Sequence, residues 1–151
     1  MKPLIVLLST FIVAIFLLKF TFGKHNIPFS ARIAISVMLL FTALGHFFYT
    51  DGMAMMIPDI IPLKRELVYF TAIIEILAAV SLHISQFRHI AAYLLIIFFV
   101  LMLPANIKAS IEQINYQTSA YDGKGLSYLL FRIPLQLLFI IWVYISSIKY
   151  N

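Results

Sequence analysis

Six polar side chains interrupt otherwise apolar stretches, and their chemistry would suit the binding and protonation of a small molecule: His46, Glu75, Asn106, Tyr128, Arg132 and Gln136. Glutamate and histidine can exchange a proton, while arginine and glutamine can donate hydrogen bonds to a carbonyl or anionic oxygen. Glu75 lies near the middle of the apolar stretch 67–82, where a charge at mid-bilayer would cost roughly 2.5–3.5 kcal/mol. This carboxyl group therefore needs a proton or a partner.

The spacing of these residues indicates that they meet at one depth. Arg132 and Gln136 are four residues apart and share a helix face, which Tyr128 extends by another turn. At about 1.5 Å per residue, all of them except Tyr128 lie roughly 5–15 Å from the same membrane face. We therefore predict a ligand-binding polar pocket, open or nearly open to one side and centred on Glu75 and Arg132.

Structural roles are the alternatives to ligand binding for the same side chains. Glu75 and Arg132 can form an ion pair that only locks helices together, and Arg132 can also extend towards its interface. His46 lies near a helix end, where interfacial hydrogen bonding is the more common role of histidine. We expect Asn106, which follows Pro104, to satisfy backbone groups that the proline leaves unpaired.

Several cofactor sites are excluded or not indicated. The chain has no cysteine, which rules out disulfides, thiolate metal sites and CxxC redox chemistry. Haem held by two histidines is rejected, because His46 lies at one rim and His83 and His89 at the other. The methionines of segment 53–56 are expected to face the membrane rather than to bind copper. The sequence therefore predicts no metal site and no intrinsic cofactor, and it identifies no catalytic residue.

The composition is that of an integral membrane protein. Of the 151 residues 63% are hydrophobic and 11% charged, compared with about 45–50% and 25% in soluble domains. The net charge of +5 does not indicate a nucleic-acid partner, because Lys and Arg collect at the ends of membrane helices, where they meet lipid. We predict an all-α membrane helical bundle that has membrane lipids as its first partners.

The chain contains five apolar runs long enough for membrane helices: 3–22, 31–49, 67–82, 90–111 and 126–148. Small residues lie on the same face as Glu75, so we expect 67–82 to be the central helix. Pro104 should interrupt the fourth run. Segment 51–66 holds prolines and charges, so it should lie along the membrane surface instead of crossing it.

An odd number of spans places the two termini on opposite sides. The side that holds the C-terminus carries basic residues and no acidic ones: Lys19, Lys24, Arg32, Arg88 and Lys149. The other side has as many basic residues, so the positive-inside rule decides little. We expect the N-terminus outside and the C-terminus inside.

Four short motifs carry a resemblance to a known family: GHF at 45–47, EIL at 75–77, PANI at 104–107 and RIPLQ at 132–136. In their order and spacing they resemble the DoxX-like family of small bacterial membrane proteins. The resemblance implies a four-helix DoxX-like core over 31–151, with 1–30 as an extra N-terminal transmembrane helix and its connection. It also implies a multi-pass protein of the bacterial cytoplasmic (inner) membrane.

Two functions follow from these expectations. In the first, the pocket binds a quinone or another lipophilic molecule as part of a redox system, and a partner redox protein supplies the electrons. In the second, the protein is a non-catalytic assembly or accessory factor in which the polar cluster only fixes helix packing. A transporter formed by an oligomer is a weaker third option. Whether the protein is an enzyme stays undecided by the sequence.

Overall fold

The computed structural model describes residues 2–23 and 26–150, and its regular elements are helices. Within this part of the chain, strand pairing is limited to one isolated bridge between Asn115 and Ala120. Lys24, predicted at the first connection, lies outside the described residues. In chain order the helices are α1 Lys2–Phe22, α2 Ile27–Phe48, α3 Thr50–Met56, α4 Lys64–Ser81, α5 Arg88–Leu101, α6 Leu103–Ile111, α7 Leu126–Tyr144 and the π-helix η1 Ile145–Lys149.

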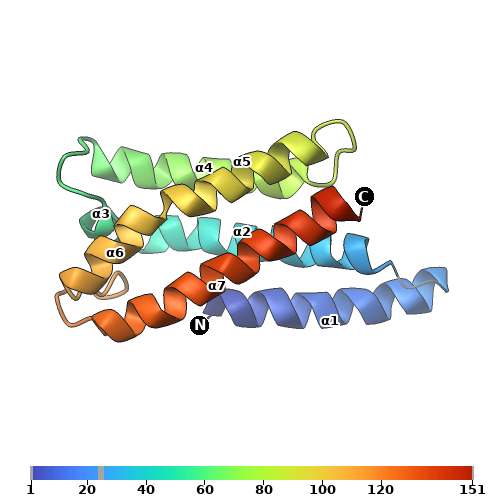
Figure 1. The fold of residues 1–151 in the computed structure, drawn as a ribbon, viewed down its shortest axis with the longest axis horizontal. Helices are drawn as coiled ribbons and strands as arrows, with labels where there is room; N and C mark the ends of the chain where they lie inside the picture. Colours follow the sequence, from blue (N-terminus) through green and yellow to red (C-terminus); the bar gives the residue numbers. More distant parts are fainter. Residues whose placement is uncertain (1, 24–25, 151) are drawn as a thin grey trace.

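The long helices run back and forth along one axis of the molecule (Figure 1). The end of α2, the start of α4, α3, α6 and the 112–125 loop gather at one end of the bundle, which we call the α3 end. The start of α2, the end of α4, the start of α5 and η1 gather at the other, which we call the η1 end. Residues distant in sequence thus meet at each end.

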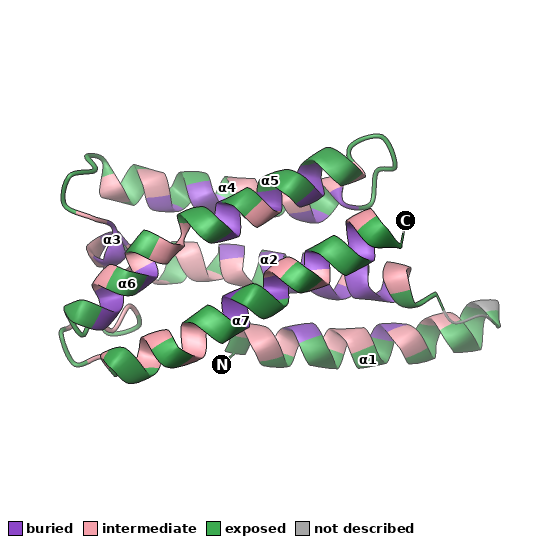
Figure 2. Cartoon of the chain, viewed as in Figure 1, coloured by how far each residue is buried: buried purple, intermediate pink, exposed green. Residues whose placement is uncertain are grey.

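The helix at the centre of the bundle is α2, which contacts α1, α4, α7, η1 and α3. The expectation that the Glu75 helix would be central is therefore wrong. Helix α4 packs on α2, α3 and α5 through one face that includes Thr71, Ala72 and Ala79, while Phe70 and Leu77 are exposed on another face (Figure 2). Glu75 does lie on the buried face, as its small neighbours predicted.

Four helical segments are long and apolar enough to cross a membrane: Lys2–Thr21, Ile27–Phe48, Arg88–Ile111 and Leu126–Lys149. They indicate a multi-pass membrane protein. All five predicted spans form helices, but α4 is not among the four. Its 18 residues include Lys64, Arg65, Glu66 and Glu75, so it is the most charged of the long helices.

The fourth run breaks where Pro104 predicts a break. Helix α5 ends at Leu101, and α6 starts again at Leu103 with the proline in its first turn. The methionines that follow α2 differ from the prediction, because Met56 is buried against Ala109 and Ile114 instead of facing the membrane. These contacts hold α3 against α6.

The 112–125 loop is fitted closely to α3. A methyl group built on Gly52 would collide with the backbone of Tyr116, so this glycine permits the close approach of the two segments. The rings of Tyr49 and Tyr116 meet edge to face at 5.9 Å beside it. The connection that follows α3 is fastened by Asp59, which forms ion pairs with Lys64 and Lys108.

We predict that Gly52→Ala destabilises the protein by about 1–3 kcal/mol, because the added methyl group must displace backbone. Gly45→Ala is the matched control, since its methyl group would meet only the end of Met53 at an ordinary 3.8 Å. Alanine is also preferred over glycine inside a helix. Thermal unfolding in detergent should show a lower Tm for Gly52→Ala alone. Equal Tm values for both variants would contradict the close contact.

Candidate functional site

Glu75 and His46 face each other between α4 and α2. Glu75 Oε2 lies 3.5 Å from Nδ1 of His46, and the two side chains are 7% and 13% exposed. Nδ1 also lies 2.8 Å from the carbonyl oxygen of Thr42, one turn earlier on α2. A nitrogen that donates to this carbonyl carries the proton, so in the neutral ring Nε2 is left as the acceptor.

The carboxyl group of Glu75 is incompletely satisfied. Oε2 is buried and has no hydrogen-bond partner, since the approach of His46 is too long for a hydrogen bond. The Thr42 hydroxyl is the other polar side-chain group beside the carboxyl. A buried carboxylate with an unpaired oxygen is costly, so this position favours a proton or a further polar partner.

Asn106 joins the polar side chains of α6 and α7. Its Oδ1 accepts hydrogen bonds from the Tyr128 hydroxyl at 3.0 Å and from Arg132 Nε at 3.3 Å. Its Nδ2 donates to Gln136 Oε1 at 3.3 Å. Asn106 and Gln136 are buried, and Tyr128 and Arg132 are half-buried. These four side chains, which we call the asparagine network, bond mainly to one another and fix α6 against α7.

Gln136 satisfies the backbone at the break between α5 and α6. Its Nε2 donates to the carbonyl oxygen of Phe99, which lies in the last turn of α5. We expected Asn106 to satisfy the backbone there, and that expectation is wrong: the Asn106 side chain instead bonds to side chains of α7. The amide that bonds to the backbone at the end of α5 therefore comes from the opposing helix α7.

The two groups of polar side chains are electrostatically connected through Arg132. Its positive charge acts on both Glu75 and His46. Among the described residues, no ion pair joins its guanidinium to Glu75. The carboxyl group of Glu75 has its ion-pair contact with His46, and Nε of Arg132 bonds to Asn106. The six predicted residues therefore lie in two groups, and the direct Glu75–Arg132 pair is not found in the part of the chain that the structure describes.

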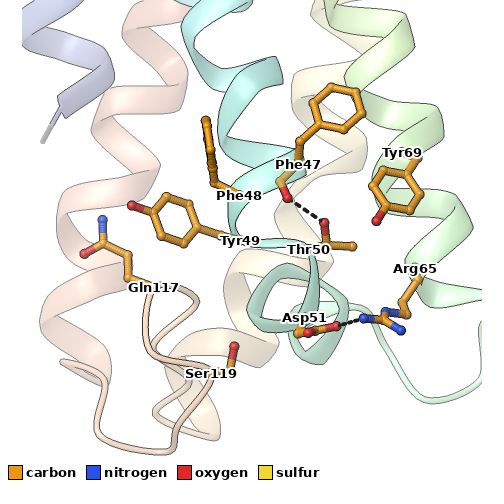
Figure 3. Close-up of a pocket in the computed structure, with 9 residues that line it drawn as sticks. All are labelled: Phe47, Phe48, Tyr49, Thr50, Asp51, Arg65, Tyr69, Gln117 and Ser119. Atoms are coloured by element: carbon orange, nitrogen blue, oxygen red, sulfur yellow. Dashed lines mark hydrogen bonds and ion pairs between the residues drawn. The ribbon is translucent and has the colours of Figure 1, made fainter.

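A pocket of about 220 Å³ lies at the α3 end, next to His46 in the chain (Figure 3). Its lining comes from the end of α2, from α3 and α4, and from the 112–125 loop: Phe47, Phe48, Tyr49, Thr50, Asp51, Arg65, Tyr69, Gln117 and Ser119. Asp51 and Arg65 form an ion pair of 2.5 Å across it. The Thr50 hydroxyl donates to the carbonyl of His46 at 2.6 Å, which connects the pocket wall to the histidine.

None of the six predicted residues lines this pocket, so the predicted site is a packed polar layer beside the pocket. Sequence reasoning missed Thr42, although its position four residues before His46 places both on one helix face. Among the residues that the structure describes, no group of three His, Cys, Asp or Glu side chains could hold a metal ion.

We predict that Asn106→Leu lowers the free energy of unfolding by about 1–3 kcal/mol, because it removes the acceptor of Tyr128 and Arg132. Asn106→Asp keeps that acceptor and replaces the donor to Gln136 with an oxygen, while its added charge lies against Arg132, so it should unfold at a temperature closer to wild type. Thermal unfolding in one detergent compares the variants. Equal destabilisation by both would contradict the role of Oδ1 as the shared acceptor.

Comparison with known proteins gives a family and no activity. The family model described as "Domain of unknown function (DUF8561)" matches residues 35–147. No curated protein and no solved structure matches the chain significantly. The family match does not test the resemblance to the DoxX-like family, which stays a prediction. Since the matched residues are most of the chain and include all six polar residues, the protein belongs to the DUF8561 family of domains of unknown function.

Proposed function

We propose that this protein binds a lipophilic small molecule with a carbonyl or anionic oxygen, a quinone being the first candidate, at the layer of Glu75, His46 and Arg132. The observation that carries the proposal is the buried Glu75 oxygen without a hydrogen-bond partner. The chain leaves this group unsatisfied, while in the asparagine network both polar atoms of the Asn106 side chain are bonded. An unsatisfied buried acid beside a histidine is an arrangement suited to proton exchange.

Each side chain has a proposed role in binding. Arg132 uses only Nε within the asparagine network, so its terminal nitrogens are available to hold the ligand oxygen. Glu75 or His46 would pass a proton to that oxygen. Gln136 has one amide hydrogen on Phe99, so it would act mainly as a support. The electrons of a redox reaction would come from a partner protein, because none of these side chains carries them.

The proposed architecture is a DoxX-like core formed by α2, α4, the α5–α6 pair and α7, with α1 as an additional helix. The DoxX-like core rests on the four sequence motifs alone. The family match begins at residue 35, inside α2, and leaves α1 out, which is consistent with α1 as an additional helix. In this arrangement α4 crosses the membrane with the other helices, since its 18 residues would extend about 27 Å. We place the protein in the bacterial cytoplasmic membrane, with its α3 end outward.

The test is quinone binding to purified protein in phosphatidylcholine nanodiscs, measured by calorimetry with a short-chain benzoquinone. Glu75→Gln and Arg132→Gln should each weaken binding at least tenfold, since each removes a polar partner of the ligand. Glu66→Gln is the matched control, because it makes the same change at an exposed position of the same helix. Its affinity should stay within twofold of wild type.

Empty nanodiscs measure how much quinone enters the lipid alone. Heat equal to that of empty nanodiscs, or wild-type affinity in a folded Glu75→Gln variant, would refute quinone binding at this layer.

A second candidate function is assembly of another membrane complex without catalysis. It is favoured by the asparagine network, which is consistent with a purely structural role, and by the connection after α3, where Ile60 and Leu63 are 90% and 70% exposed. In a deletion strain, membrane proteomics would identify subunits that are lost. If Glu75→Gln combined with Arg132→Met restores them and Ile60→Ser combined with Leu63→Ser does not, the assembly function is correct.

A further inference from the structure

The η1 end of the bundle holds a buried arginine that the proposed function does not use. Arg32 lies on α2 and is 7% exposed. Its Nη1 donates to the carbonyl of Ser146 at 2.9 Å, and its Nε is buried without a hydrogen-bond partner. A cation in this position has lost most of its hydration and regained few hydrogen bonds.

The structure around Arg32 fixes the position of its guanidinium. Ser146 belongs to η1, where the π-helical pairing loosens the regular α-helical hydrogen bonding and the Ser146 carbonyl accepts from the arginine. The indole of Trp142 donates to the carbonyl of Ala31 at 3.0 Å, which ties α2 to α7, the helix that η1 continues. The Phe29 ring lies 5.8 Å from the guanidinium carbon. The charge is therefore held in place on several sides.

Two further basic side chains lie beside Arg32. His83 follows α4, and its Nε2 lies 3.0 Å from the Ser36 hydroxyl, which itself donates to the carbonyl of Ala79. Arg88 begins α5 and donates to the carbonyl of Leu82 at 3.2 Å. Burial and the charges of Arg32 and Arg88 lower the pKa of His83 below its ordinary value. Arg32 and Arg88 are therefore neighbouring positive charges, while the lowered pKa favours the neutral imidazole of His83, which still carries one N–H donor.

The chain supplies no acidic side chain at this end to balance them. All six Asp and Glu residues are among the described residues. Asp51, Asp59 and Glu66 lie in α3, at the start of α4 or between these two helices. Glu112 and Asp122 belong to the 112–125 loop, and the sixth is Glu75. Neighbouring acidic residues therefore do not offset the cost of burying Arg32, and an external anion would do so.

We propose that Arg32, Arg88 and His83 form a binding site for a phosphate oxyanion, supplied by the headgroup of an anionic phospholipid. Arginine is suited to phosphate because its planar group donates several hydrogen bonds at once. Basic pockets between membrane helices are typical binding sites for anionic headgroups. Half-buried Arg88 and exposed His83 give such a headgroup access, with Arg32 beneath them. Free phosphate has the same chemistry, and the experiment separates the two sources.

The test uses the only tryptophan of the chain, Trp142, which bonds to the residue before Arg32. Its fluorescence is followed in detergent micelles during titration with phosphatidylglycerol, phosphatidylcholine or inorganic phosphate. We expect phosphatidylglycerol to bind at least tenfold more tightly than phosphatidylcholine. Arg32→Gln and Arg88→Gln should each reduce this affinity at least fivefold, because each removes a charge that contacts the phosphate.

Arg65→Gln is the matched control, since it removes an arginine charge at the α3 end and should leave the affinity within twofold. Arg88→Gln keeps the test decisive if Arg32→Gln does not fold. Competition by inorganic phosphate at similar concentration would identify free phosphate as the source and support the oxyanion site. Equal affinity for both lipids without phosphate binding, or unchanged affinity in folded Arg32→Gln and Arg88→Gln, would overturn the proposal.

Discussion

A polar group buried between apolar helices must find its partner within the protein, because hydrocarbon offers none. This constraint accounts for most of the polar contacts in the bundle. The carbonyl of Phe99 receives the amide of Gln136, the carbonyl of Ser146 receives Arg32, and the carbonyl of Ala31 receives Trp142. In each case a side chain of one helix bonds to the backbone of another. The pairings therefore fix which helices are neighbours as well as satisfying single atoms.

Against this background, two buried side-chain atoms of the described residues lack a hydrogen-bond partner: Oε2 of Glu75 and Nε of Arg32. One is an acid near the α3 end, and the other is a base at the η1 end. The contact of Glu75 with His46 is too long for a hydrogen bond, and Arg32 lies beside a second cation, Arg88. Side chains of neighbouring helices reach the carbonyls of Phe99 and Ser146, so the same kind of bond could have paired these two atoms. Both proposals supply the missing partner from outside the chain, a ligand oxygen beside Glu75 and a headgroup phosphate beside Arg32.

The sequence predicted the elements better than their arrangement. Apolar run length found every long helix, and Pro104 located the break between α5 and α6. Composition could not show that α2 is central, because helix order in a bundle depends on contacts between segments far apart in the chain. Spacing along single helices predicted one depth for the polar residues, and it placed Arg132 and Gln136 on one helix face. It could not choose between Asn106 and Gln136 as the donor to the Phe99 carbonyl, because that choice depends on how far each amide reaches across to another helix.

The segregation of charge connects the two ends of the molecule. Acidic side chains lie at the α3 end or at Glu75, whereas Arg32 and Arg88 lie at the η1 end without any. Counts of Lys and Arg in the loops decide little about orientation, since both sides carry similar numbers. A site for anionic headgroups adds an independent argument, because such lipids are concentrated in the cytoplasmic leaflet. It would place the η1 end inside and the α3 end outside, so that Glu75 and His46 would be reached from the outer half of the membrane.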